Sequence, residues 1–187
     1  QPGVRPANVI AFTFTEKAAA ELKERVHRTV TAKLPGIVGL AEMYIGTMHG
    51  FCLDLLQTYI PETFKYGVLT DITQQLLIDR ETNKSGFNTA VKTVQGVESS
   101  LRRYTDTRVF KGALSILQED AVDFGLVPPE TTASLAKYKD FLADKRYFDY
   151  TSMMVEAVGF LERSQTATIL DTAEQSLRDH VENDVKY

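Results

Sequence analysis

The 187-residue sequence has few of the residues that mark several classes of protein. Its single cysteine, Cys52, excludes an internal disulfide, and its apolar helical surroundings predict a buried, inert thiol in a reducing compartment. Its three histidines have no partner at the spacing of metal ligands. No apolar run approaches the roughly 20 residues that span a bilayer. We therefore expect a soluble, cytoplasmic protein with no metal site and no membrane segment.

Motifs of self-sufficient enzymes are also missing. The sequence has no G-x-S-x-G nucleophile elbow and no Cys–His pair signalled by spacing. Gly36 and Gly39 do not belong to a G-x-x-x-x-G-K-[ST] loop, the pattern that cradles phosphates. We therefore expect no catalytic residue, no bound cofactor and no nucleotide hydrolysis in this chain by itself.

The charge is slightly negative and unevenly distributed. A net charge of −4 argues against a protein that coats nucleic acid by bulk electrostatics. Residues 1–33 nevertheless carry six Lys and Arg against three Asp and Glu, whereas residues 165–187 carry two against five. A second basic cluster comprises Arg102, Arg103, Arg108 and Lys111. A solvated helical face is the common explanation of such a cluster.

The first sixty residues predict two strand–helix units. Residues 8–14 (NVIAFTF) are β-branched and aromatic, as is typical of a buried strand. A helix follows at once, with Thr15 as its cap and an apolar stripe at helical spacing. Residues 42–47 (EMYIGT) predict a second strand, and residues 48–60 predict a helix that Pro61 stops. This order with short turns indicates parallel strands and an α/β sheet.

The rest of the chain predicts helices and no strand of comparable strength. The helical stretches are 71–84, which begins with Asp71 as a cap; 107–125, closed by Gly125; 128–148, opened by prolines; 148–164, capped by Asp149; and about 166–182. We therefore expect a predominantly helical α/β protein, in which two strand–helix units are followed by a helical insertion and by helices that return to the sheet.

The two strand-to-helix junctions have the composition of a ligand site. In an open parallel sheet, ligands bind at the carboxyl ends of the strands. The junctions "TFTEK" (13–17) and "GTMHG" (46–50) combine hydroxyls, amides at a helix N-terminus and a ring, Phe14 or His49. Amides and hydroxyls suit phosphate oxygens and rings suit bases, so the junctions fit single-stranded nucleic acid. The alternative for Phe14 is a core position, since aromatic residues are usually buried.

Three segments resemble superfamily 1 DNA helicases of the UvrD/Rep/PcrA type. "VIAFTFTEKAAAELKERV" is similar to motif Ia of that family, and "YIGTMHGFCLDLL" is similar to the next block, G-T-[FM]-H followed by a helix. "FDYTSMMVEAV" resembles the segment just ahead of the Walker B carboxylates. The resemblance implies an internal fragment of the first RecA-like domain that starts after Walker A and stops short of Walker B.

This resemblance implies a division of the chain and a set of contacts. It implies a partial RecA-like parallel sheet in residues 1–70, a mainly helical inserted subdomain in 71–147, and helices returning to the motor domain in 148–187. It also implies single-stranded DNA contacts, with a base stacked on Phe14 and the strand beside Thr15, Thr47 and His49. In this setting the basic cluster would contact duplex DNA, through Arg102, Arg103, Arg108 and Lys111.

The resemblance further implies the activity of a parent protein. That parent would be an ATP-dependent DNA helicase or translocase that moves 3′ to 5′. Its ATP and Mg²⁺ would be bound outside this chain. The second motor domain of the parent would be a partner of this chain. The 187-residue chain alone would be inactive as an ATPase. Two alternatives stay open: a non-catalytic nucleic-acid-binding or interaction module, and part of a recombination nuclease-helicase subunit.

Overall fold

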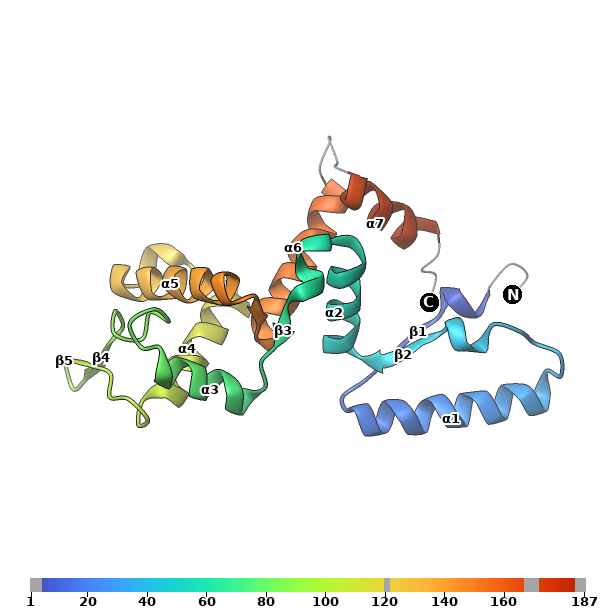
Figure 1. Ribbon diagram of the computed structural model, residues 1–187, viewed down its shortest axis with the longest axis horizontal. Helices are drawn as coiled ribbons and strands as arrows, with labels where there is room; N and C mark the ends of the chain where they lie inside the picture. The colour runs from blue at the N-terminus through green and yellow to red at the C-terminus, as the bar shows by residue number, and fades with distance from the viewer. Residues whose placement is uncertain (1–4, 120–121, 167–171, 184–187) are drawn as a thin grey trace. The chain divides into compact units, whose positions relative to one another are not determined.

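The computed structural model describes residues 5–119, 122–166 and 172–183 (Figure 1). In chain order the elements are η1 (Pro6–Asn8), β1 (Ile10–Thr13), α1 (Glu16–Lys33), η2 (Leu40–Glu42), β2 (Tyr44–Thr47), α2 (Met48–Tyr59), η3 (Pro61–Lys65), β3 (Gly67–Val68), α3 (Asp71–Arg80), β4 (Val91–Val94), β5 (Val97–Ser100), α4 (Thr107–Glu119), η4 (Phe124–Leu126), α5 (Pro129–Lys145), β6 (Tyr147–Phe148), α6 (Tyr150–Thr166) and α7 (Thr172–Asn183). The predicted predominance of helix is confirmed, and the sheets are small.

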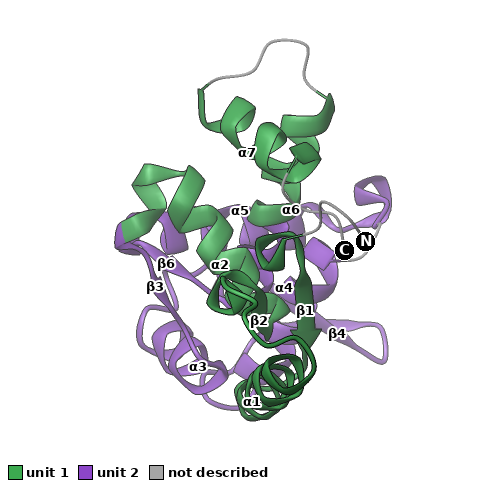
Figure 2. Ribbon diagram, turned by 90° about the vertical axis from the view of Figure 1, so that its right-hand side faces the viewer, with its two compact units in different colours: residues 1–64, 156–187 green, residues 65–155 purple. Residues whose placement is uncertain are grey.

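The chain divides into two compact units, coloured separately in Figure 2. Unit 1 comprises residues 1–64 and 156–187, and unit 2 comprises residues 65–155. Helix α6 contributes its first residues to unit 2 and the remainder to unit 1. No helix of the described residues is long and apolar enough to cross a membrane.

Unit 1 contains the predicted pair of parallel strands. β1 and β2 pair in parallel, with Ile10 opposite Tyr44 and Thr13 opposite Thr47. Helix α1 begins at Glu16 and is capped by Thr15, as the sequence predicted. Burial of Ala19 places the apolar stripe of α1 against this sheet, because α1 contacts both strands. The strand–helix–strand–helix order of the first sixty residues is therefore confirmed.

A second apolar cluster in unit 1 joins three helices. Its buried members are Leu55 of α2, Phe160 of α6 and Leu177 of α7. Helix α2 ends at Tyr59, just before the predicted stop at Pro61. The last helix was predicted from about residue 166; α7 begins at Thr172, and residues 167–171 lie outside the described part of the chain.

Unit 2 is built from helices around a larger core. Its buried cluster includes Ile78 of α3, Phe110 and Leu114 of α4, and Tyr138 and Leu142 of α5. A two-residue parallel pairing joins β3 to β6, with Gly67 opposite Tyr147 and Val68 opposite Phe148. The prolines at the start of α5 and the cap at Asp149 are where the sequence predicted them.

Three local predictions for unit 2 are wrong. An antiparallel hairpin, β4–β5, lies where no strand was expected, and its turn at Gln95 and Gly96 has positive φ at both residues, as a type I′ turn requires. Helix α4 ends at Glu119 rather than at Gly125, which lies in the separate turn η4. Thr70 rather than Asp71 caps α3, because the Thr70 hydroxyl accepts the hydrogen bond of the Thr73 amide at 3.2 Å.

Candidate nucleic-acid interface

The register of β1 and β2 brings the two predicted junctions to one edge of the sheet. Thr13, the last residue of β1, lies opposite Thr47, the last residue of β2. Two residues separate β1 from α1, and α2 follows β2 directly, so both helices start at this edge (Figure 1). We call it the β1–β2 edge. It contains Phe14, Thr15, Glu16, Thr47 and His49.

A threonine hydroxyl caps each helix at the β1–β2 edge. Oγ1 of Thr15 accepts a hydrogen bond from the Ala18 amide at 3.1 Å. Oγ1 of Thr47 accepts one from the Gly50 amide, also at 3.1 Å. Each cap satisfies one of the backbone donors that a helix start leaves without a partner. The Thr15 cap was predicted from the sequence and is confirmed.

Glu16 links the two junctions, a contact that sequence reasoning missed. Oγ1 of Thr47 donates a hydrogen bond to Oε1 of Glu16 at 2.8 Å. Glu16 lies in the first turn of α1, where a negative charge is also stabilised by the helix dipole. Within one junction, the Thr13 hydroxyl donates to the carbonyl of Thr15 at 3.1 Å. Hydrogen bonds therefore join the two junctions at the β1–β2 edge.

Tyr44 supports this edge from inside the sheet. Its hydroxyl donates to the carbonyl of Thr47 at 3.0 Å. Burial raises the pKa of Tyr44, and the carboxylates of Asp54 and Glu16 raise it further, so the hydroxyl stays protonated and able to donate. Gly46 makes room for the ring, because a Cβ at residue 46 would lie 2.6 Å from the Tyr44 hydroxyl oxygen.

Phe14 is fully exposed, which excludes the core position that its aromatic character alone would favour. The rings of Phe12, Tyr44 and Phe51 instead form a cluster, with Tyr44 and Phe51 edge to face at 5.1 Å between centroids. His49 lies half-buried in the first turn of α2. The ring of Phe14 thus presents its area to solvent at the same edge as the start of α2.

The four basic residues of the second cluster have different surroundings. Arg102 and Arg103 are exposed; Nε of Arg102 lies 3.7 Å from Oδ2 of Asp106, and the Arg103 guanidinium lies 4.7 Å from the centroid of the Tyr104 ring. Arg108 is exposed as well. Lys111 is buried and forms an ion pair with Asp71, so its ammonium is held inside unit 2.

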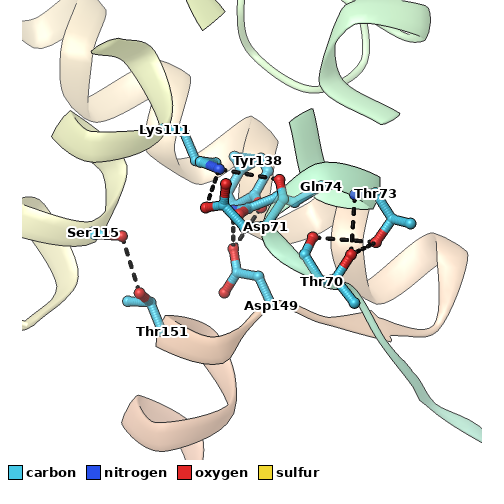
Figure 3. Close-up of polar contacts among 9 residues, drawn as sticks. All are labelled: Thr70, Asp71, Thr73, Gln74, Lys111, Ser115, Tyr138, Asp149 and Thr151. Carbon is cyan, nitrogen blue, oxygen red and sulfur yellow. Dashed lines mark hydrogen bonds and ion pairs between the residues drawn. The ribbon is translucent and has the colours of Figure 1, made fainter. Parts of the chain in front are cut away.

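A buried polar network in unit 2 also went unnoticed in the sequence (Figure 3). Oδ2 of Asp149 accepts hydrogen bonds from Nε2 of Gln74, at 2.7 Å, and from the Tyr138 hydroxyl. The other oxygen, Oδ1, accepts from the Ser152 amide at 2.7 Å and caps α6. Burial and the charge of Asp149 raise the pKa of Tyr138. The Asp149 cap was predicted, but its partners on α3 and α5 had no signal in the sequence.

The described residues do not fit ATP or Mg²⁺. The turn after β1 has two residues, and β2 runs directly into α2, so neither junction can wrap around phosphates as a glycine-rich loop does. Within residues 5–119, 122–166 and 172–183, no group of three or more His, Cys, Asp and Glu side chains could hold a metal ion.

Comparison with known proteins gives one family. The model of the UvrD/REP helicase N-terminal domain matches residues 1–187. A probable DNA helicase of Mycoplasma pneumoniae is 25% identical over 167 residues, which is 87% of this chain and 30% of the relative. The ATP-dependent DNA helicase PcrA of Staphylococcus aureus is 28% identical over 170 residues, or 86% of this chain and 21% of the relative. The chain thus spans about a third or less of the length of these relatives.

Proposed function

The chain belongs to the UvrD/REP helicase N-terminal domain family, and from this premise we propose that its parent protein is an ATP-dependent DNA helicase. The names of the matched relatives, a probable DNA helicase and PcrA, support this activity. The resemblance of the three segments quoted above to helicases of the UvrD/Rep/PcrA type supports movement of the parent along DNA in the 3′-to-5′ direction. ATP and Mg²⁺ belong to other parts of the parent, since the described residues do not fit them. The 187-residue chain by itself is inactive as an ATPase.

The role of this chain is to contact single-stranded DNA at the β1–β2 edge. The observation that carries this proposal is the full exposure of the Phe14 ring beside two helix starts. An apolar ring is stabilised by covering its surface, and stacking of a base on an aromatic side chain is worth about 1–3 kcal/mol. Thr15, Thr47 and His49 border the DNA strand at this edge.

A second surface contacts duplex DNA ahead of the motor. Arg102, Arg103 and Arg108 are exposed and carry the positive charge that phosphates attract. Lys111 has a supporting part, because its ion pair with Asp71 joins α4 to the start of α3 near Arg108. The domain division into residues 1–70, 71–147 and 148–187 belongs to the same proposal.

The Phe14→Ala variant tests the single-strand contact. We expect the affinity of the 187-residue chain for a fluorescent oligothymidylate, measured by anisotropy at low salt, to fall by about fivefold or more, the loss of one stacked base. Phe64→Ala is the matched control, because Phe64 is another exposed phenylalanine of unit 1, and we expect no change in its affinity. Equal binding by wild type and Phe14→Ala would remove Phe14 from the interface.

A further inference from the structure

The side chain of Glu16 reaches from one strand–helix junction to the other. It belongs to the first turn of α1, yet it accepts the hydrogen bond of Thr47, the residue that caps α2. The two residues are 31 positions apart in the sequence. They meet because β1 and β2 run in parallel and end in the same row. A single exposed carboxylate therefore lies against both helix starts.

The hydrogen bonds of Thr47 leave it without a proton to offer a ligand. A threonine hydroxyl has one proton to donate, and that of Thr47 goes to Glu16. Its oxygen already accepts from the Gly50 amide, and its carbonyl accepts from Tyr44. A phosphate oxygen needs donors, so the Thr47 side chain does not suit a phosphate while Glu16 holds it.

The charge of Glu16 acts in the same direction. Its carboxylate is exposed at the β1–β2 edge, and like charges repel, so a phosphate is disfavoured beside it. Two residues earlier, Phe14 exposes an uncharged ring. The β1–β2 edge thus repels the phosphates of a DNA strand at Glu16 and offers the bases of that DNA a stacking surface at Phe14.

We propose that Glu16 is a positioning residue for single-stranded DNA: it holds the Thr47 cap and keeps phosphates off the β1–β2 edge, so that the strand meets this edge through its bases. The inference rests on the proposed single-strand contact and adds which face of the strand the edge takes. Removing the charge of Glu16 should therefore strengthen, rather than weaken, binding to every DNA strand that carries phosphates.

The test compares two ligands and three variants of the 187-residue chain. The ligands are a fluorescent oligothymidylate and an oligomer of equal length built from abasic nucleotides, which has the phosphates without the bases. Glu16→Gln removes the charge and keeps an oxygen that can accept from Thr47. Glu16→Ala removes both the charge and the acceptor. Glu24→Gln is the matched control, because Glu24 is exposed on α1 and outside the β1–β2 edge.

We expect Glu16→Gln to tighten binding of both ligands by up to about fivefold, the effect of one unit charge at contact distance in water. Glu24→Gln changes neither ligand, since its charge is distant and screened. Glu16→Ala tightens binding more than Glu16→Gln does, because the Thr47 hydroxyl proton no longer has an acceptor in the protein and can be donated to a phosphate oxygen. Amide hydrogen exchange of Gly50 reports this loss without DNA: it accelerates in Glu16→Ala and stays at the wild-type rate in Glu16→Gln.

Each result has a distinct meaning. If Phe14→Ala binds oligothymidylate as well as wild type does, the single-strand contact fails, and the inference about Glu16 fails with it. If Phe14→Ala weakens binding but Glu16→Gln behaves like Glu24→Gln, the contact stands and the inference about Glu16 is overturned. If Glu16→Ala and Glu16→Gln agree in affinity and in Gly50 exchange, Glu16 repels phosphates but does not position Thr47, and the positioning role is withdrawn.

Discussion

At the β1–β2 edge of unit 1, Thr15 and Glu16 lie at the surface beside the exposed ring of Phe14, whereas in unit 2 Asp149 and Tyr138 are buried and bonded to each other. Both regions use a polar side chain to start a helix. In unit 1 the Thr15 cap borders solvent, so a ligand can approach it, whereas the Thr47 cap is buried. In unit 2 the cap is enclosed by side chains of α3 and α5, so its hydrogen bonds serve packing. The same local device is therefore open to solvent in one unit and enclosed by packed side chains in the other.

The largest effect is expected where the polar network is buried. Asp149→Ala removes the acceptor of the Tyr138 hydroxyl and of the Ser152 amide, and it leaves Gln74 Nε2 with the Tyr138 oxygen alone. We expect the free energy of unfolding of unit 2 to fall by about 3 kcal/mol, since buried donors lose their partners. Urea unfolding followed by circular dichroism measures the loss, and hydrogen exchange locates it in residues 65–155.

The control for that variant is Asp144→Ala. Asp144 is an exposed carboxylate on α5 of the same unit, and a surface change of this kind stays within about 0.5 kcal/mol. If Asp149→Ala were as mild as Asp144→Ala, the buried network would contribute nothing to stability, and the contrast between the two units would disappear.

A smaller effect is expected from crowding the β1–β2 edge. Gly46→Ala places a Cβ 2.6 Å from the Tyr44 hydroxyl oxygen, so the ring must move and lose its hydrogen bond to the Thr47 carbonyl. We expect a loss of about 1–3 kcal/mol in unit 1, the usual cost of overpacking. Hydrogen exchange of residues 5–64 measures it.

Titration of Tyr44 sharpens the interpretation of that variant. Its pKa is raised in the folded chain mainly by burial. Displacement of the ring should bring the pKa down toward the ordinary value, which tyrosinate absorbance reports. A Gly46→Ala protein with unchanged exchange and an unchanged Tyr44 titration would show that the edge has room for a methyl group.

The smallest expected effect is that of low pH, which should lower the stability of unit 2 before that of unit 1. A hydrogen bond from Lys111 lowers the pKa of Asp71, and one from Lys92 lowers the pKa of Asp106. A lowered pKa stabilises the fold fully above the ordinary aspartate value, about 3.9, and this stability is lost as the pH falls through the lowered values. Among the described residues both carboxyl groups with a lowered pKa lie in unit 2, so this unit should lose stability first below that pH.

Lys111→Met checks the origin of the acid effect. The variant keeps an apolar stem of similar length and removes the ammonium from Asp71. Its acid unfolding curve, followed by hydrogen exchange of unit 2, should depend less on pH than that of wild type. An identical pH dependence in the two proteins would assign the effect to other groups.

Local patterns predicted much of unit 1 and less of unit 2. The Thr15 cap and the parallel strands follow from short-range spacing, and the structure confirms them. The β4–β5 hairpin was missed although its turn carries a Gln95–Gly96 pair between valines. The end of α4 was misplaced because Gly125 is a strong stop signal that acts in a later turn.

The sequence by itself determined the starts of α1, α2 and α6, the parallel strand pair and the family resemblance, because each depends on residues that are neighbours along the chain. Only the tertiary structure decided which side chains meet. Glu16 reaches Thr47 through the register of two strands, and Lys111 is buried because α4 packs beside the start of α3. Hydrogen bonds and burial depend on distance in space, and residues far apart in the sequence carry no local signal of their approach.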